Sequence, residues 1–313
     1  MEQPATPRTD LNKGISRRSF LKYCGAVAAA LGLGPSYAAR IADALTSPDR
    51  PPVLWLHFAE CTGCSEAFLR STQPSVEQIL FDTISLDYHE TVMVASGVQA
   101  EANRDEIVAK YAGQFICIVE GAIPTAQNGI YGTIGGRTML DIAKSVIPKA
   151  GSVIAFGTCS SFGGLASAAP NPTGAKGVQD ALGVQTINIS GCPPSPITLV
   201  STLASYLLYD KVPPLDAMGR PLFAYGKRVH DHCNKPYGCI ESLGCKGKKT
   251  YGSCPNVKFN DATSWDVQAG HHCVGCTEPA FWDQFAPLYS KEFTTKFFQD
   301  YAFIGKGKAV PKS

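Results

Sequence analysis

Short apolar runs alternate with amphipathic stretches through the middle of the chain, from residue 53 to about residue 209. The apolar runs have strand length, and we expect strands at 53–58, 83–87, 115–119, 153–156 and 186–189. Helical spacing between them predicts helices at 65–79, 104–111, 138–147, 175–182 and 197–208. Apolar strands that alternate with helices are typical of a parallel sheet covered on both faces. This order predicts an α/β fold with a flavodoxin-like, doubly wound domain over residues 45–210.

The pattern changes after residue 210. Between residues 211 and 313, glycine, proline and lysine are frequent and helix or strand periodicity is rare, yet six of the twelve cysteines lie there. A segment with so little regular structure needs another source of order, and bound metal supplies it because ligation contributes to the folding free energy. We therefore expect residues 211–313 to form a smaller, loop-rich domain that carries iron–sulfur clusters or another metal.

The N-terminus has the pattern of an export signal. Arg17 and Arg18 precede a short apolar stretch, residues 23–34, which small residues follow. This twin-arginine pattern predicts a cleaved signal peptide over residues 1–44 and a periplasmic protein, whereas a chance Arg-Arg pair is the alternative. The apolar stretch is too short to span a bilayer, and no later segment is long enough either, so we expect no transmembrane anchor.

Composition narrows the function further. The net charge of +2 is too small to indicate a nucleic-acid-binding protein. The cysteines are crowded and unevenly placed, which favours metal ligation over the disulfides that export would otherwise permit. Cys24 would leave with the signal peptide, and Cys117, inside an expected strand, is best explained as a small buried hydrophobic residue.

Four thiols follow three of the expected strands. Cys61 and Cys64 come after the first strand, Cys159 after the fourth and Cys192 after the fifth. The carboxyl ends of parallel strands meet at one edge, where open α/β sheets bind their ligands. The sequence therefore predicts that three separate loops present these thiols at the ligand-binding edge of the sheet.

Thiolates select zinc, copper(I) or iron–sulfur clusters. Zinc is the main alternative, because the pairs Cys61/Cys64 and Cys273/Cys276 have the spacing of zinc ribbons. Structural zinc sites usually join two close-spaced pairs, however, whereas the first domain draws its thiols from three distant loops. This difference favours iron–sulfur chemistry, with a non-catalytic zinc protein as the alternative.

Eight motifs resemble, in order, those of the small, electron-transferring subunit of [NiFe] hydrogenases. They are AECTGCSEAFLR, DYHETVM, VEGAIPT, GTCSSFGG, NPTGAKGV, GCPPSP, LGCKGKKTYGSCP and GHHCVGCTEPAFWD. The resemblance implies an exported hydrogenase in which a separate large subunit holds the nickel–iron site and oxidises H₂. This chain would pass the electrons to a cytochrome or a membrane electron-acceptor subunit. The alternative is a cluster-bearing subunit of a quinone reductase-like complex, but the second domain and the signal peptide argue against it.

The resemblance also implies three clusters and their ligands. The proximal [4Fe–4S] cluster would use Cys61, Cys64, Cys159 and Cys192. The distal [4Fe–4S] cluster would use His230, Cys233, Cys239 and Cys245. The medial [3Fe–4S] cluster would use Cys254, Cys273 and Cys276, while His232, His271 and His272 are expected in supporting or surface roles. The resemblance also makes Glu60 and Glu66 candidates for a proton relay at the proximal cluster. The alternative for Glu66 is a charge at a helix N-terminus or an ion pair at the subunit interface.

At three positions this chain differs from some or most members of the family. Asp266 replaces a proline that most of the family carries near the medial cluster. A carboxylate there could complete a medial [4Fe–4S] cluster; otherwise Asp266 turns to solvent or caps a turn, and the cluster stays [3Fe–4S]. Gly63 and Gly164 stand where oxygen-tolerant members carry extra cysteines, which predicts an ordinary proximal cluster and inactivation by air.

The segment around the distal ligands is short and basic. Only residues 234–238 separate Cys233 from Cys239, where the family commonly has a longer segment. Six cations outnumber Asp231 and Glu241 nearby: Lys227, Arg228, Lys235, Lys246, Lys248 and Lys249. We expect this basic patch either to dock an acidic electron acceptor or to be an ordinary solvated loop surface.

Overall fold

The computed structural model describes residues 17–45, 50–72, 75–76, 79–80, 84–209, 211–236, 238–259, 261–279 and 281–285. All of the predicted cluster ligands lie within these ranges. The last residues of the predicted second domain, 286–313, and the first sixteen residues of the predicted signal peptide lie outside them. The predicted division of the chain at residues 44 and 210 therefore stays a prediction.

The centre of the protein is a sheet of five strands. The strands are β1 (Pro52–His57), β2 (Ser85–His89), β3 (Ile116–Glu120), β7 (Ser152–Phe156) and β9 (Ile187–Ile189). Their order is β2-β1-β3-β7-β9, and every neighbouring pair is parallel. This is the doubly wound, flavodoxin-like order, in which the direction of winding reverses between β1 and β3. The predicted α/β class and the five predicted strands are confirmed.

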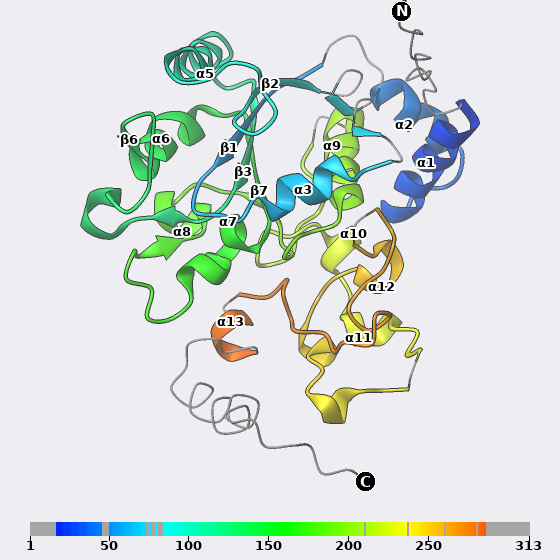
Figure 1. Cartoon of the computed structure of the whole chain (residues 1–313). Helices are drawn as coiled ribbons and strands as arrows, with labels where there is room; N and C mark the ends of the chain where they lie inside the picture. Colours follow the sequence, from blue (N-terminus) through cyan, green and yellow to red (C-terminus); the bar gives the residue numbers. More distant parts are fainter. Residues whose placement is uncertain are drawn as a thin grey trace, which may run out of the picture.

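Helices cover both faces of the sheet (Figure 1). Along β1, Val53 and Trp55 point to the face covered by α3 (Gly63–Leu69) and α9 (Pro196–Tyr209). Leu54 and Leu56 point to the other face, under α5 (Val98–Lys110), α6 (Met139–Val146) and α8 (Val178–Leu182). Both faces are apolar because the strand is buried on both sides. Cys117 is fully buried in the second of these clusters, as predicted.

Three predicted helices have different bounds. The helix expected at 104–111 is α5, which already begins at Val98. The helix expected at 65–79 is α3, which ends at Leu69. The helix expected at 175–182 begins later, because Ala175–Lys176 form strand β8, which pairs with β4 (Ile123–Pro124). Gly177 separates this strand from α8, and a Cβ atom there would lie 2.5 Å from the Ser161 carbonyl oxygen. A larger side chain would not fit at this position, so glycine allows the chain to pass close to Ser161 between the strand and the helix.

The remaining short elements connect the larger ones. They are α7 (Thr158–Phe162), β5 (Thr133–Ile134), β6 (Arg137–Thr138), η2 (Ala126–Gly129), η3 (Ile147–Lys149) and η4 (Gly164–Ser167). Strands β5 and β6 form a small antiparallel hairpin that directly precedes α6 in the chain. The helix α7 matters most for function because it follows β7 directly at the carboxyl edge of the sheet.

The described part of the N-terminal region, residues 17–45, forms two helices, α1 (Arg17–Ala30) and α2 (Tyr37–Leu45), which lie against α9 (Figure 1). Cys24, Val27 and Ile41 are fully buried there, in the same apolar cluster as Trp55. Burial raises the pKa of the Cys24 thiol to about 11. None of the described helices combines the length and the apolar character needed to cross a membrane.

Among the described residues beyond 210, all helices are short, and they lie at the carboxyl edge of the sheet (Figure 1). They are α10 (Leu222–Tyr225), α11 (Val229–His232), η5 (Glu241–Leu243), η6 (Gly247–Lys249), α12 (Cys254–Val257) and α13 (Phe281–Gln284). We call residues 211–285 the cluster domain. Its buried apolar cluster consists of Val229, Trp265, Val267 and Cys273, with Cys233, Cys245 and Cys254 packed against it. The loop-rich character predicted for this region holds for its described residues.

Candidate iron–sulfur cluster sites

The four predicted proximal ligands lie together at the carboxyl edge of the sheet. Cys61 and Cys64 follow β1, and Cys64 sits in the first turn of α3. Cys159 lies in the first turn of α7 after β7, and Cys192 follows β9. Because β1 borders the reversal point of the sheet, these loops open into the crevice where such folds bind ligands.

The thiols are close enough to influence one another. Burial raises the pKa of Cys64 well above its ordinary value, and Glu120, Cys159, Cys192 and Cys61 raise it further. Burial also raises the pKa of Cys192 to about 12, with further contributions from Cys159 and Cys61. Thiols in such a group repel one another when ionised, and bound metal cations remove this penalty by ligating the thiolates. The donor set therefore fits a thiolate-ligated cluster.

Glycines allow the loops to approach the thiols. Gly157 has a φ of +104°, and a Cβ atom there would lie 2.5 Å from the Cys64 Sγ atom. Gly164, with a φ of +52°, would place its Cβ atom 2.7 Å from Cys159 Sγ, and Gly63 would place one 3.1 Å from Cys61 Sγ. The two positions predicted to distinguish oxygen-sensitive from oxygen-tolerant relatives thus both lie beside proximal thiols.

Glu120, at the end of β3, is a residue that the sequence analysis missed. Its carboxylate accepts hydrogen bonds from the backbone N–H groups of Cys64 and Ser65, both at 3.0 Å, and from Ser65 Oγ at 2.6 Å. Trp55 Nε1 donates to the same carboxylate at 3.3 Å. Burial raises the pKa of Glu120, but hydrogen bonds from His57 and Ser65 lower it more. An acidic residue that ends an otherwise apolar strand was the available signal.

Two histidines complete this buried polar network. The Ser65 hydroxyl lies 2.9 Å from His57 Nε2 and 3.3 Å from His89 Nε2. Burial, followed by the neighbouring His57, lowers the pKa of His89 to about 3, so His89 is neutral at ordinary pH. The network ties the first turn of α3, and with it Cys64, to strands β1, β2 and β3.

The two candidate relay carboxylates differ in their surroundings. Glu66 is exposed and forms a 2.7 Å ion pair with Arg70, one turn along α3. Glu60 is partly buried, and burial and then Glu120 raise its pKa. Thr62 Oγ1 donates to one Glu60 oxygen at 3.1 Å, whereas the other is buried without a hydrogen-bond partner in the described part of the chain. The ion pair favours the structural alternative for Glu66 and leaves Glu60 as the stronger candidate.

The four predicted distal ligands line one hollow of the cluster domain. His230, Cys233, Cys239 and Cys245 share it with Trp265 and Val267. The other histidines lie differently. His232 makes a 2.8 Å hydrogen bond to the Gly252 carbonyl oxygen, and His271 and His272 stack with ring centroids 4.4 Å apart.

The predicted medial ligands form a third group, and Asp266 lies beside it. Burial raises the pKa of Cys254 to about 12 and that of Cys273 to about 11. The negative charge of Asp266 contributes to the raised pKa of Cys254, Cys273 and Cys276 alike. Burial raises the pKa of Asp266 itself, and His271 partly offsets this increase. The Asp266 charge therefore acts on all three medial thiols.

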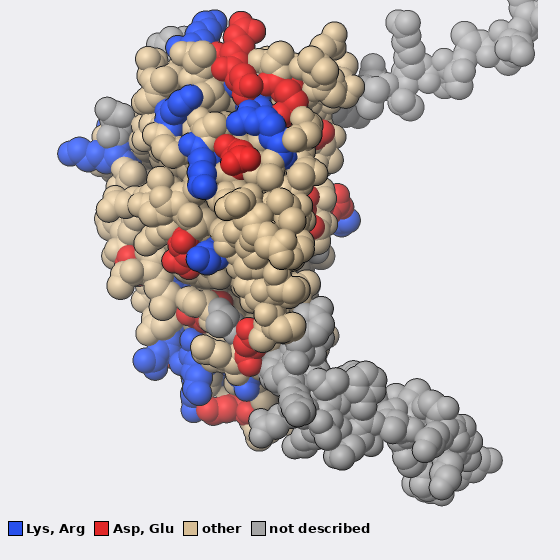
Figure 2. Space-filling view, turned by 90° about the vertical axis from the view of Figure 1, so that its left-hand side faces the viewer, with Lys and Arg blue, Asp and Glu red and all other residues tan. Residues whose placement is uncertain are grey.

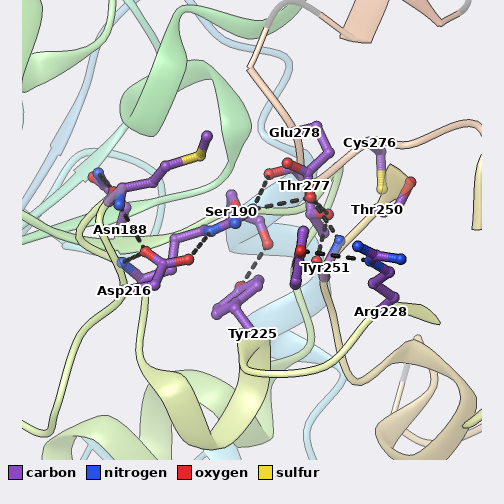
Figure 3. A network of polar contacts seen from close by, with 12 residues as sticks. Asn188, Ser190, Asp216, Tyr225, Arg228, Thr250, Tyr251, Cys276, Thr277 and Glu278 are labelled. Carbon is purple, nitrogen blue, oxygen red and sulfur yellow. Dashed lines mark hydrogen bonds and ion pairs between the residues drawn. The ribbon is translucent and has the colours of Figure 1, made fainter. Parts of the chain in front are cut away.

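A buried network of polar contacts around Arg220 lies within the cluster domain, and Figure 3 shows four of its members, Asp216, Tyr225, Tyr251 and Glu278. The Arg220 side chain donates to Asp216 at 2.8 Å and to Glu278 at 3.0 Å. Its guanidinium lies between the rings of Tyr225 and Tyr251, 5.4 and 5.6 Å from their centroids. Glu278 also accepts the Tyr251 backbone N–H at 2.6 Å. Since Glu278 comes two residues after Cys276, this network fixes the medial loop.

The spacing of the candidate ligands bears on the kind of metal group that they could hold. In the described residues, no three His, Cys, Asp or Glu side chains converge closely enough to hold one metal ion. The thiolates of an iron–sulfur cluster bind different iron atoms and need not meet at one point. The three groups are thus compatible with clusters.

Three protein families match parts of the chain. The twin-arginine translocation pathway signal sequence matches residues 14–34. The 20 kDa subunit of NADH ubiquinone oxidoreductase matches residues 61–206, and the C-terminal region of NiFe/NiFeSe hydrogenase small subunits matches residues 219–289. The match of the sheet region explains why a quinone reductase-like subunit was the alternative, and the match of the cluster domain disfavours it.

Similar proteins cover most of the chain. The periplasmic [NiFe] hydrogenase small subunit 1 of Nitratidesulfovibrio vulgaris is 51% identical over 88% of this chain and 94% of its own length. The periplasmic [NiFe] hydrogenase small subunit of Solidesulfovibrio fructosivorans is 45% identical, over 90% of this chain and 95% of its own. The [NiFeSe] hydrogenase structure from Desulfomicrobium baculatum matches with a TM-score of 0.71 at 37% identity, covering 77% of this chain and 99% of that one.

A twin-arginine leader, a doubly wound sheet and thiol groups along its carboxyl edge define an exported, iron–sulfur electron-transfer protein. The chain belongs to the family of [NiFe] hydrogenase small subunits. It is the periplasmic, electron-transferring component of a heterodimeric hydrogenase, and its partner is the large subunit. The predicted family, fold, function and export route are confirmed, and iron–sulfur is supported over zinc.

Proposed function

We propose that this subunit carries electrons from H₂ oxidation through three clusters in the order proximal, medial, distal. The ligands are those predicted from the sequence: Cys61, Cys64, Cys159 and Cys192; Cys254, Cys273 and Cys276; and His230, Cys233, Cys239 and Cys245. Each cluster would supply one-electron redox chemistry at its site.

One observation carries this order. Cys192 of the proximal group is among the charges that act on Cys276 of the medial group. Cys245 of the distal group likewise acts on Cys273, and the Lys246 N–H donates to the Cys273 carbonyl oxygen at 2.8 Å. The medial group thus has contacts with both of the others, which supports a linear path.

The proximal edge is the candidate docking face for the large subunit. Cys61 and Cys192 are exposed in the isolated chain. Apolar side chains, including Ile130, Tyr131 and Leu165, are also exposed. Figure 2 shows one face of the molecule with a broad area free of Lys, Arg, Asp and Glu between two charged ends. Exposed thiols and apolar side chains are features that a permanent partner covers.

Glu60 is the candidate proton carrier at this edge. Its raised pKa and its unpartnered buried oxygen suit a group that takes up and releases protons. Glu66 is tied to Arg70 and is the weaker candidate.

The cluster proposal is tested by iron and acid-labile sulfide analysis of the purified heterodimer, with electron paramagnetic resonance of each cluster. Serine variants at Cys192, Cys254 and Cys245 should each remove one signal and leave the other two. H₂-dependent dye reduction should fall in all three, and Cys117→Ser is the matched control because Cys117 is buried away from the sites. Zinc in place of iron, or loss of the same signal in all three variants, would refute the assignment.

We further propose that Asp266 completes a medial [4Fe–4S] cluster. Its negative charge acts on all three medial thiols, which supports a ligand role over that of a turn cap. The oxidised wild-type protein should lack a three-iron resonance signal, and Asp266→Pro should show one. Asp266→Glu tests whether a carboxylate is enough. A strong three-iron signal in the wild type excludes Asp266 as a ligand and leaves the medial cluster as [3Fe–4S].

The surroundings of the proximal ligands lead us to propose that the enzyme is sensitive to oxygen. Gly63 and Gly164 provide no extra thiolates beside Cys61 and Cys159, so the proximal cluster should be an ordinary [4Fe–4S] cluster. We expect air to inactivate the enzyme. Sustained H₂ oxidation under atmospheric oxygen would contradict this.

The electron acceptor is proposed to be a cytochrome or a membrane subunit that docks on the basic patch. Lys227, Arg228, Lys235, Lys248 and Lys249 are exposed, and Lys246 is half-buried. Figure 2 shows Lys and Arg side chains gathered at the lower end of the molecule, which the cluster domain forms.

A further inference from the structure

The side chain of Thr158 lies between two of the proposed cluster sites. Only 1% of Thr158 is exposed. Its hydroxyl donates a hydrogen bond to the carbonyl oxygen of Cys276 and accepts one from the Gly191 N–H at 2.9 Å. The Thr158 backbone N–H in turn donates to the Gly191 carbonyl oxygen at 2.9 Å.

These bonds join three ligand loops at one residue. Thr158 directly precedes Cys159, Gly191 directly precedes Cys192, and Cys276 is itself a proposed medial ligand. A threonine hydroxyl has one proton to donate, and here that proton goes to the medial loop while a lone pair accepts from the proximal side. Thr158 therefore connects two proximal loops to the medial loop.

The other contacts around this junction are less direct. Arg220 Nη1 donates to the Thr277 carbonyl oxygen at 3.3 Å, and Tyr225 Oη donates to the Ser190 carbonyl oxygen at 2.6 Å. Each of these bonds reaches the loop of one ligand, whereas the Thr158 hydroxyl bonds to both sides. Burial also shields the Thr158 hydrogen bonds from competing water.

We propose that Thr158 is a positioning residue that fixes the medial site against the proximal site and provides the hydrogen-bonded link across which the electron passes. This inference rests on the ligand assignment proposed above. Clusters held by these ligands would exchange one electron across this link, and Thr158 would keep its proton throughout. Transfer through bonds and a hydrogen bond is faster than transfer across an unbonded gap.

Thr158→Val tests the link, because valine has nearly the same shape and no hydroxyl. Thr158→Ser keeps the hydroxyl and is the rescue variant. Thr202→Val is the matched control, since the Thr202 hydroxyl bonds to the Thr198 carbonyl oxygen within α9 at 2.8 Å. Iron and sulfide content is measured first in each purified heterodimer, followed by the magnetic interaction of the two clusters and freeze-quenched electron transfer between them.

Thr158→Val should slow proximal-to-medial transfer several-fold and should weaken the magnetic interaction, because the hydrogen-bonded link is lost. Thr158→Ser and Thr202→Val should match the wild type. If Thr158→Val loses the medial cluster while Thr158→Ser keeps it, the positioning role is also supported. Equal behaviour of the valine and serine variants, whether both normal or both impaired, overturns the inference. Absence of the clusters from the wild type would instead refute the ligand assignment.

Discussion

The sheet region and the cluster domain are ordered in different ways. The sheet buries apolar side chains on both faces, with Trp55 fully enclosed between Phe68 and Phe156. The cluster domain has a far smaller apolar centre, and one of its members, Cys273, is itself a proposed ligand. Hydrophobic burial is sufficient to fold the first region. The second has its proposed ligands where a core would be, so its fold should depend on the metal.

Removing the iron gives the largest expected effect. Chelation under reducing conditions should abolish hydrogen-exchange protection over residues 229–278, because the ligand groups supply the missing core. Strands β1, β3 and β7 should keep their protection, since apolar burial orders them independently. Hydrogen exchange read by mass spectrometry compares the two regions in one sample. Equal loss in both regions would mean that the sheet also depends on the clusters.

A buried ion-pair network inside the cluster domain gives the next largest effect. Arg220→Met should lower the free energy of unfolding by about 3 kcal/mol, because it leaves Asp216 and Glu278 without their buried cation. Arg70→Met is the matched control. It removes an exposed ion pair with Glu66 and should change stability by less than about 0.5 kcal/mol. Denaturant unfolding measures both, and similar values for the two variants would contradict the importance of burial.

Acid should lower the stability of the protein by protonating Glu120, which holds the first turn of α3 to the sheet. Its folded pKa lies below the ordinary value, so its contribution to stability is complete above the unfolded pKa. That contribution is lost as the pH falls through the folded pKa. Glu120→Gln cannot ionise and should show a smaller loss of stability between about pH 5 and pH 3. Thermal unfolding of the wild type and the variant across this pH range measures the loss of stability. Parallel curves for the two proteins would contradict a contribution from Glu120.

The smallest effect concerns the surface of the cluster domain. If the basic patch docks an acidic acceptor, the rate with that acceptor should fall a few-fold as the salt concentration rises from about 0.05 to 0.5 M. Dye reduction should stay constant. Lys248 is already paired with Glu241 at 2.7 Å, so Lys235→Gln should matter more than Lys248→Gln. A salt-independent rate with the natural acceptor would remove the patch from the docking surface.

The sheet region was easier to predict from the sequence than the cluster domain, because only the sheet region is ordered mainly by apolar burial. Strand and helix periodicity comes from burial, so β1, β3, β7 and α9 were predicted to within a few residues. The strand-end rule also placed Cys61, Cys159 and Cys192 at one edge without any structure. In the cluster domain the spacing of the cysteines has no period, and only resemblance to a family indicated which residues share a site.

Residues that act through hydrogen bonds escaped sequence analysis altogether. Glu120, Arg220 and Thr158 each bond to a group more than thirty positions away along the chain. Nothing local in their segments indicates those partners. Asp266 was noticed because it replaces an expected residue, whereas the effect of its charge on three thiols emerged only in the folded chain.

The proximal ligands follow three strands, β1, β7 and β9, that are far apart along the chain, and this spacing has a consequence for biosynthesis. The ribosome must complete the chain from Cys61 to Cys192 before the four thiols can meet, and it must reach Cys276 before the medial group exists. The leader, in contrast, emerges first and carries the address for export. A precursor could therefore be recognised for secretion long before it can hold any iron. Because the twin-arginine route carries proteins that are already folded, we expect clusters that depend on the finished fold to be inserted between synthesis and export.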